Sequence, residues 1–194
     1  MSNIFIISGP SGAGEDSVME GLQKILPIER IVNTTSRAMR PNESNGTPYW
    51  FVSEEKFINK IESNEFIEWA KQYNGNYYGV TKDEIERVKK TGKITVWKIE
   101  WQGVMTVKKI HPEIRSIFIM APSLQILESR IRRRQDVSEE YVKERMEYSQ
   151  EWMKHQDIYD YKVINEEGKL EETIQKVAEI IKNELGKIQA TTNV

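Results

Sequence analysis

A glycine-rich segment near the N-terminus has the composition of a phosphate-binding loop. Ser8-Gly-Pro-Ser-Gly-Ala-Gly14 follows a short apolar run, residues 4–7, and precedes apolar residues at helical spacing. Glycines let the backbone curl, so that several N–H groups and a helix N-terminus can point at one anion. Gly9 and Gly14 have the spacing of the pattern G-x-x-x-x-G-K-[ST]. The alternative is an ordinary glycine-rich turn between a strand and a helix.

The end of this loop departs from the pattern at two positions. Glu15 stands where the pattern has lysine, and Asp16 stands where it has the hydroxyl residue that binds Mg²⁺. At an effective dielectric constant of ~20, two unit charges about 4 Å apart interact by roughly 4 kcal/mol. Replacing the positive charge of this lysine by a negative charge is therefore expected to lower the rate by several powers of ten unless another group compensates. Asp16 is still suited to Mg²⁺, because a carboxylate is a hard ligand, and the Ser17 hydroxyl follows directly.

Apolar runs and helical patterns alternate along the chain, which is typical of an α/β fold with a mostly parallel sheet. Short apolar runs predict strands at residues 4–7, 31–35, 94–99, 116–120 and 162–164. Residues 66–78 predict a hairpin, because Asn74-Gly75 is a strong turn signal. Apolar residues at helical spacing from Leu170 to Ile181 mark a final helix. We expect a frayed tail after Gly186.

Capping residues predict several helix boundaries. Ser53 is suited to cap a short helix, and Thr81 with Glu84 has the spacing of a capping box. His111-Pro112 should end another helix, and residues 123–152 form a helical pattern with a break near 135–137.

Composition excludes several classes of protein. The chain has 194 residues, 38% of them hydrophobic, with 28 Lys and Arg against 30 Asp and Glu, and no cysteine. This length and composition are those of one globular domain. Without cysteine, a disulfide, a cysteine nucleophile and a cysteine zinc site are all excluded. A net charge of −2 argues against a general nucleic-acid binder. The two histidines, His111 and His155, are interpreted as surface residues at helix ends rather than as a metal centre.

The N-terminal region has neither a membrane span nor a secretion signal. Its longest apolar stretch, residues 4–7, is far below the roughly 20 residues that a bilayer requires. A basic segment followed by an apolar core, as in a signal peptide, is also missing. We therefore expect a cytoplasmic protein that binds neither membranes nor nucleic acid.

Several separated motifs together resemble the guanylate kinase family, whose members carry phosphate from ATP to GMP. The resemblance covers residues 4–181. After the glycine-rich loop, its motifs are the segments Thr34–Val52, Glu65–Ala70, Gly75–Gly79, Gln102-Gly103, Arg130–Arg134 with Arg145, and Val163–Asn165. The combination is specific, whereas the loop alone would not be.

The resemblance implies a P-loop kinase fold in one domain, with a parallel central sheet flanked by helices, a small mixed GMP-binding subdomain and a helical lid. The core would comprise residues 1–32, 81–123 and 156–186. The GMP-binding subdomain would be 33–80, the lid 124–155 and the tail 187–194. Such a protein would act on GMP and ATP with Mg²⁺, as a monomer or a homodimer.

The resemblance also implies roles for individual side chains on the acceptor side. Arg37 and Arg40 would grip the GMP phosphate, with hydroxyl donors from Tyr49 and Tyr78. Glu43 would order their loop. Glu68 would accept hydrogen bonds from guanine N1 and N2, which adenine cannot provide in that form. Further substrate contacts are assigned to Asn33, Val80, Thr81 and Glu100.

On the donor side the resemblance assigns the ATP site to the glycine-rich loop and the lid. The ATP-binding residues would be Gly9, Ser11, Gly12, Ala13, Gly14, Glu15, Asp16, Ser17, Arg130 and Asn165, with Asp16 and Ser17 on Mg²⁺. Arg134 and Arg145 would close over the phosphates and, with Arg37 and Lys98, form the catalytic set. Without the resemblance, the arginine cluster at 130–134 is equally well interpreted as a solvated helix face.

Three further positions depart from the family. The family has serine where this chain has Asn33 and Val80, and Thr81 could supply a displaced hydroxyl. It also has an acid where this chain has Lys98, beside Glu100 on the central strand. Alternate residues of a strand share a face, and the end of this strand should lie beside the glycine-rich loop. This suggests that charge has been exchanged: Lys98 would pair with Glu15, or would replace the missing lysine at the phosphates. Alternatively, Lys98 only neutralises Glu15.

Three functions are compatible with these residues. The first is a guanylate kinase, catalysing ATP + GMP = ADP + GDP. The second is a related binding module that has lost catalysis and uses the Arg37, Arg40, Tyr49 and Tyr78 pocket for a phosphorylated partner. The third is a kinase of another small phosphate acceptor, such as ribose bisphosphate, because the loop ends in Gly-x-Asp-Ser. The retained lid arginines and Asp16 favour an enzyme.

Overall fold

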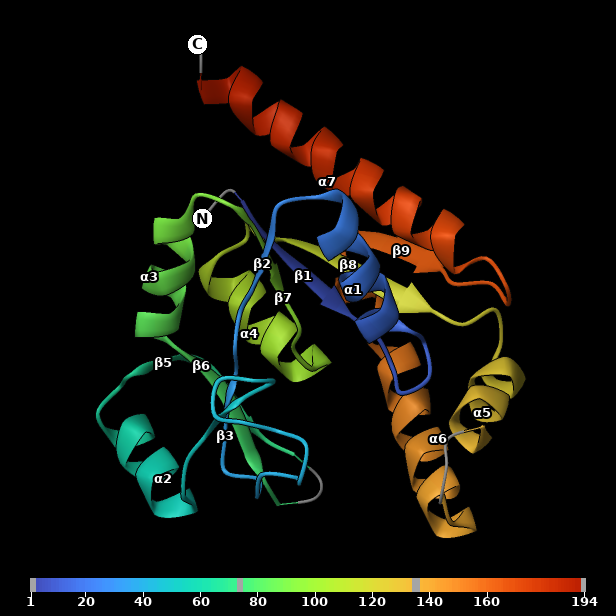
Figure 1. Cartoon of the computed structure of the whole chain (residues 1–194), viewed down its shortest axis with the longest axis horizontal. Coiled ribbons are helices and arrows are strands. Elements are labelled where there is room, and N and C mark those ends of the chain that lie inside the picture. The colour runs from blue at the N-terminus through green and yellow to red at the C-terminus, as the bar shows by residue number, and fades with distance from the viewer. Residues whose placement is uncertain (1–2, 73–74, 134–136, 193–194) are drawn as a thin grey trace.

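A five-stranded parallel sheet forms the centre of the structure, a computed structural model that describes residues 3–72, 75–133 and 137–192 (Figure 1). Its strand order is β2-β7-β1-β8-β9. The strands are β1 (Ile4–Ser8), β2 (Ile28–Arg30), β7 (Ile94–Trp97), β8 (Arg115–Met120) and β9 (Tyr161–Ile164). The predicted α/β class with a parallel sheet flanked by helices is confirmed.

The central strand β1 is buried along its whole length because helices cover both faces of the sheet. Phe5 and Ile7 face a cluster formed with α1 (Glu15–Ile25) and α7 (Leu170–Thr192). Ile4 and Ile6 face the opposite cluster, formed with α3 (Lys82–Thr91) and α4 (Trp101–Ile110). The loop after β1 therefore emerges at the middle of the carboxyl edge of the sheet, where ligands of open α/β sheets bind.

A second, mixed sheet has the order β4-β3-β6-β5. Its strands are β3 (Thr34–Thr35), β4 (Trp50–Phe51), β5 (Phe66–Lys71) and β6 (Tyr77–Thr81), and α2 (Glu54–Glu62) packs against it. The ring of Phe57 on α2 stacks on Phe66, with 4.4 Å between ring centroids. In Figure 1 this sheet and α2 lie below the large sheet on one side, and α5 (Leu124–Arg132) and α6 (Glu139–Lys154) lie below it on the other.

Most predicted elements are present, but the strand predicted at residues 31–35 is wrong. The chain pairs with the large sheet through β2, leaves it after Ile31, and joins the small sheet at Thr34. The N–H of Ile31 still donates to Val96 O, whereas Asn33 O already accepts from Trp50 N. One apolar run thus serves two sheets. The hairpin of β5 and β6 is confirmed; Asn74 of its predicted turn lies outside the described residues.

Helix caps follow the sequence closely, with two differences. The side chains of Ser53 and Thr81 each accept a hydrogen bond from the backbone N–H three residues later, that of Lys56 and of Glu84, as predicted. The Glu84 carboxylate, however, accepts from Val32 N and Arg87 rather than completing a capping box. The expected tail after Gly186 is also wrong, because α7 continues to Thr192 and runs beyond the sheet (Figure 1).

The two histidines end helices, as predicted: His111 caps α4 and His155 caps α6. Within the three described ranges, no helix combines the length and apolar character needed to cross a bilayer.

Candidate active site

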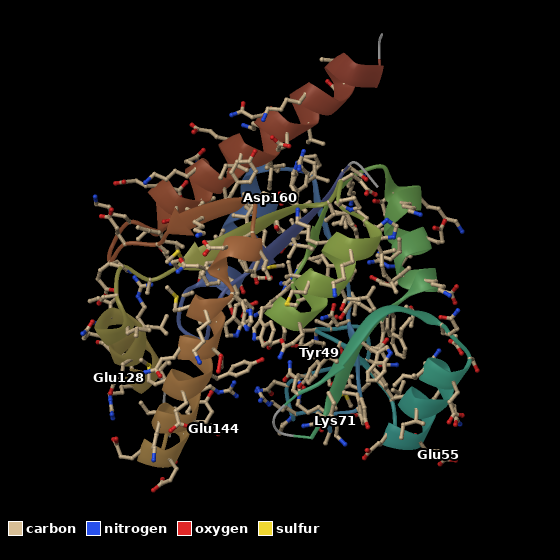
Figure 2. The ribbon with its side chains drawn as sticks, turned by 180° about the vertical axis from the view of Figure 1, so that it is seen from behind. Tyr49, Glu55, Lys71, Glu128, Glu144 and Asp160 are labelled. Atoms are coloured by element: carbon tan, nitrogen blue, oxygen red, sulfur yellow. The ribbon has the colours of Figure 1, made fainter. Side chains whose placement is uncertain are left out.

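A cavity of 290 Å³ opens at the carboxyl edge of the large sheet, between that edge, the small sheet and α6. The glycine-rich loop contributes Ser8, Gly9, Ser11, Glu15 and Asp16; the small sheet and its loops contribute Arg40, Tyr49, Glu68, Gln72 and Tyr78; α6 contributes Tyr141, Arg145, Tyr148 and Trp152. Figure 2 shows Tyr49 between the part of the molecule marked by Glu55 on α2 and the part marked by Glu144 on α6. Residues far apart in sequence thus line one space.

The glycine-rich loop takes a conformation that requires glycine. Gly12 and Gly14 have φ angles of +90° and +95°, which side chains disfavour. A Cβ on Gly9 would lie 2.5 Å from the carbonyl oxygen of Ile119. Gly14 also caps α1, whose N-terminus faces the loop. Backbone N–H groups at such a helix N-terminus are free to point at an anion.

The buried side chain of Asn165 holds this loop from behind. Its Nδ2 donates to Ala13 O at 2.9 Å, and its Oδ1 accepts from the Thr173 hydroxyl at 3.2 Å. Nδ2 lies 2.4 Å from where a Cβ on Gly14 would stand. Asn165 was predicted as an ATP contact, and in the structure it positions the loop and lines a second cavity behind it.

Lys98 lies between the two carboxylates that begin α1. Its Nζ is 3.1 Å from Glu15 Oε1 and donates to Asp16 Oδ2 at 2.7 Å. Arg30 also pairs with Asp16, with 3.7 Å between Nη2 and Oδ1. Burial alone would lower the pKa of Lys98, but the charges of Glu15 and Asp16 outweigh this and raise it. The predicted pairing of Lys98 with Glu15 is present, and Asp16 joins it.

Arg37 is fixed by Glu43 six residues later in the loop between β3 and β4. The Nη2 of Arg37 donates to both carboxylate oxygens of Glu43, at 2.8 and 2.9 Å, and Glu43 also accepts from Arg40 N at 2.8 Å. The Arg37 guanidinium lies over the rings of Tyr49 and Phe51. Glu43 therefore orders this loop, as predicted, and Arg37 is held beside the cavity that Arg40 and Tyr49 line.

Two carboxylates, Glu68 and Glu100, line the same cavity, the first buried and the second half-buried. Glu68 is only 5% exposed, and burial, followed by the charge of Glu100, raises its pKa to about 8. Burial likewise raises the pKa of Glu100. The Glu68 carboxylate lies against Gly103, where a Cβ would be 2.8 Å from Oε2. Such a carboxylate is suited to accept hydrogen bonds from paired N–H donors of a ligand.

Glu100 connects three parts of the molecule. It accepts from Tyr148 Oη of α6 at 2.5 Å and from Gln72 Nε2 beside β5 at 3.0 Å. The sequence analysis missed Gln72 and Tyr148. No local pattern marks them, because each reaches Glu100 only through tertiary contacts.

Two residues assigned to the substrate lie elsewhere. Val80 is fully buried in the apolar cluster with Ile85 and Trp97, and the Thr81 hydroxyl accepts from Glu84 N to cap α3. Val80 lies near the end of β6, where the strand packs against α3, and Thr81 ends the strand. Asn33 does line the cavity, with its Nδ2 donating to Lys98 O at 3.0 Å.

The second cavity, of 350 Å³, lies on the other side of the glycine-rich loop. Its walls include Gly12, Gly14, Ser17, Arg130, Arg133 and Asn165. Arg130 donates to Asn165 O at 2.8 Å and pairs with Glu167 at 3.2 Å. Arg133 also pairs with Glu167, a partner that the sequence analysis did not identify.

Of the two predicted lid arginines, Arg145 lies on α6 in the wall of the first cavity, with its guanidinium 5.0 Å from the ring centroid of Tyr141. Arg134 lies outside the described residues.

The two cavities meet at Glu15 and Asp16, which line both. A ligand in one would therefore face a ligand in the other across the N-terminus of α1.

Comparison with known proteins gives one consistent result. A family model described as guanylate kinase matches residues 1–184. The chain is 42% identical over 170 residues to the guanylate kinase of Idiomarina loihiensis, covering 86% of this chain and 80% of that protein. It is 39% identical over 185 residues to that of Rickettsia prowazekii, covering 95% and 92%. Among solved structures, guanylate kinase from Anaplasma phagocytophilum is similar, with a TM-score of 0.72 and 30% identity over 93% of this chain and 85% of that one.

Proposed function

This chain belongs to the guanylate kinase family, and we propose that it transfers the terminal phosphoryl group of ATP to GMP, forming ADP and GDP. It is a nucleoside monophosphate kinase in this assignment. One observation of the structure carries the proposal. The glycine-rich loop and the acceptor-side residues Arg40, Tyr49, Glu68 and Tyr78 line a single cavity.

Phosphoryl transfer depends on placing two nucleotides in line and on neutralising the negative charge that spreads over the transferred group. In this site GMP occupies the first cavity, with its phosphate toward Arg37, Arg40 and Tyr49. ATP lies along the second cavity, with its phosphates over the glycine-rich loop. The two phosphate chains meet at the N-terminus of α1, whose backbone N–H groups favour anions.

Glu68 supplies selectivity for guanine. In its ionised form it accepts from guanine N1–H and N2–H, whereas the N1 of adenine is itself an acceptor and would leave a buried carboxylate unpaired. Glu100, held by Tyr148 and Gln72, lies beside it and extends the acceptor surface.

The helices α5 and α6 bring arginines to both cavities. Arg130 lines the second cavity and Arg145 the first, and the family resemblance assigns Arg134 to the ATP phosphates as well. Closure of these helices over ATP would bring further positive charge to the phosphates and exclude water that would otherwise accept the phosphoryl group.

The residues at the start of α1 fit Mg²⁺. Glu15 and Asp16 offer carboxylate oxygens and Ser17 a hydroxyl, and Mg²⁺ is usually held by one or two carboxylates together with substrate phosphates. In the part of the chain that the structure describes, no group of three acidic or histidine side chains converges on a metal position. The ion, when bound, supplies positive charge to the β- and γ-phosphates. Asp16 and Ser17 would hold it; the Asp16 carboxylate, which accepts from Lys98 in this structure, would then turn to the ion, and Lys98 would remain with Glu15.

A coupled assay of ADP formation tests this function. With ATP and Mg²⁺, we expect turnover with GMP and dGMP that far exceeds turnover with AMP or ribose bisphosphate. Turnover with ribose bisphosphate instead would assign a different acceptor. Absence of turnover with every acceptor, together with GMP binding by calorimetry, would identify a binding module. The conservative variant Glu68→Gln provides a control, because it should lose GMP turnover while remaining folded.

A further inference from the structure

The phosphate site contains a charge arrangement that its loop pattern does not explain. The pattern places a lysine at position 15, directly beside the phosphates, and this chain has Glu15 there. An acid at the N-terminus of α1 repels the ligand that the loop is shaped to bind. Either the site has lost its positive charge, or another residue supplies it.

Lys98 brings a positive charge to this place from the neighbouring strand. It follows β7, which pairs with β1 in the sheet, so that the two strand ends lie side by side. Its ammonium contacts the carboxylates of both Glu15 and Asp16. Its side chain remains 34% exposed, whereas that of Glu15 is 12% exposed. The lysine therefore has access to the cavity that it lines, and the less exposed Glu15 holds its ammonium.

The position of Lys98 relies on more than the ion pairs. The Asn33 side chain donates to the backbone oxygen of Lys98, and the Ser8 hydroxyl, at the end of β1, donates to Ile99 O at 2.6 Å. These bonds attach the backbone around Lys98 both to the glycine-rich loop and to the start of the acceptor side. The lysine is thus fixed relative to both phosphate sites.

Lys98 also lies near the acceptor phosphate site. It lines the first cavity together with Gly9, Ser11 and Tyr49. Burial raises the pKa of Tyr49, and the positive charge of Lys98 acts in the opposite direction. A cation between the glycine-rich loop and Tyr49 is located where donor and acceptor phosphates must meet.

We propose that Lys98 contacts the transferred phosphoryl group in place of the missing loop lysine, and that Glu15 is its positioning residue. This inference rests on the proposed kinase function. In the reaction, the bond between the γ-phosphorus and the β–γ bridging oxygen breaks, and its electron pair stays on ADP. A phosphate oxygen of GMP forms the new bond to phosphorus. Lys98 neutralises charge on the group in transit and exchanges no proton.

A competing explanation is that Lys98 only neutralises Glu15. The variants Lys98→Met and Glu15→Gln/Lys98→Met separate the two explanations, because the double variant has no uncompensated acid at position 15. If Lys98 contacts the phosphoryl group, kcat falls at least about 100-fold in both variants, as for loss of a group that stabilises transition-state charge. Recovery of the double variant to within about threefold of Glu15→Gln would overturn the proposal.

The exchanged pair, Glu15→Lys/Lys98→Glu, tests whether the two positions form one unit. Each single change leaves two like charges facing each other and should reduce kcat at least about 100-fold. Together they restore a cation to the loop, and we expect kcat within about tenfold of the parent. If the exchanged pair melts like the parent but is no more active than the single variants, the proposal is overturned. Lys93→Met, which removes another lysine ion pair with Glu29 next to β7, should change kcat less than twofold.

Nucleotide binding provides a readout that does not depend on turnover. By calorimetry with Mg²⁺, Glu15→Gln/Lys98→Met should bind a non-hydrolysable ATP analogue about tenfold more weakly than Glu15→Gln, and ADP less than threefold more weakly. Equal losses for both ligands, or no loss, would contradict contact with the transferred group. If the parent itself shows no turnover with GMP, the proposed function fails, and the binding comparison still tests Lys98.

Discussion

Phosphate is expected on both sides of the first cavity, and the two sides hold their cations in different ways. On the acceptor side, Glu43 holds Arg37 through two hydrogen bonds, and the two residues are six positions apart in one loop. On the donor side, Glu15 and Asp16 hold Lys98, which is more than eighty positions away in the sequence. In both places a carboxylate fixes the position of a cation.

The two charge pairs differ in how far apart their members lie in the sequence. Arg37 and Glu43 belong to one loop, so the conformation of that loop alone brings them together. Lys98 and Glu15 meet only because β7 and β1 are neighbours in the parallel sheet. A charge can therefore move from the loop to the strand while the site keeps a cation. Such an exchange of charge requires that β1 and β7 are always neighbours in the sheet.

Replacing Arg37 should produce the largest effect on the acceptor side. In Arg37→Met we expect kcat/KM for GMP to fall about 100- to 1,000-fold, roughly 3 to 4 kcal/mol, because a charge-assisted phosphate contact is lost and Glu43 is left unpaired. Steady-state kinetics with GMP varied measure this. Arg37→Lys keeps the charge but not the paired geometry and should lose less. An unchanged KM for GMP in Arg37→Met would show that Arg37 does not bind the acceptor.

The two sides should also differ in their dependence on pH. Glu68 must be ionised to accept from guanine, and its pKa is raised to about 8. GMP affinity should therefore fall about tenfold per pH unit below pH 8. The KM for ATP should stay nearly constant, since the raised pKa of Lys98 keeps that side chain charged.

AMP affinity measured over the same pH range is the control for titration of the nucleotide phosphate, since both ligands share that group. The ratio of GMP to AMP affinity isolates the base. A ratio that does not change between pH 6.5 and 8.5 would contradict the role of Glu68.

The same carboxyl group links stability to pH. Its pKa is raised from 4.5 in the unfolded chain to about 8, so the folded protein holds a proton that the unfolded chain releases in this range. The free energy of unfolding contributed by Glu68 therefore falls as pH rises from 4.5 to 8. Glu68→Gln stays neutral at every pH. It should raise the melting temperature by a few degrees at pH 8.5, and much less at pH 5.

Replacing the carboxylates that hold these cations should change the kinetics for one substrate at a time, with a smaller effect than replacing Arg37. Glu43→Gln and Glu15→Gln each leave the cation in place but loosen it, and we expect changes of about three- to tenfold. Glu43→Gln should raise the KM for GMP. Glu15→Gln should affect kcat and the KM for ATP. If Glu15→Gln instead raised only the KM for GMP, the assignment of Glu15 to the donor side would be wrong.

The smallest effect on activity is expected from Asn165→Ala, which removes the support behind the glycine-rich loop. Ala13 O loses its buried donor, a cost of about 1 to 3 kcal/mol. The melting temperature should fall by several degrees. The KM for ATP should rise a few-fold, while the KM for GMP stays unchanged. Differential scanning fluorimetry and kinetics with each substrate varied test this.

Much of the fold could be predicted because local physics determines it. Continuous apolar runs mark the buried strands β1, β7 and β8, and the caps Ser53 and Thr81 mark the starts of α2 and α3. The strand at residues 31–35 could not be predicted correctly, because its residues are equally suited to either sheet. The expected tail after Gly186 failed for another reason: residues such as Lys187 and Ala190 have adequate helix propensity to extend α7.

For the site, motifs identified residues whose neighbours are local. The glycine-rich loop and the Arg37–Glu43 segment were located in this way. Val80 was misassigned because a resemblance marks a position and not the direction of the new side chain. Valine at that place makes a core contact instead of a ligand contact, because this end of β6 packs against Ile85 and Trp97.

By itself the sequence determined the α/β class, the glycine-rich loop, the acid at position 15 and its candidate partner Lys98. The tertiary structure decided that Asp16 shares this lysine, that Asn165 supports the loop, and that Tyr148 and Gln72 converge on Glu100. The physical reason is range. Hydrophobic period, caps and turns act over a few residues, whereas the charges of the site interact across strands whose proximity is set by the order of the sheet.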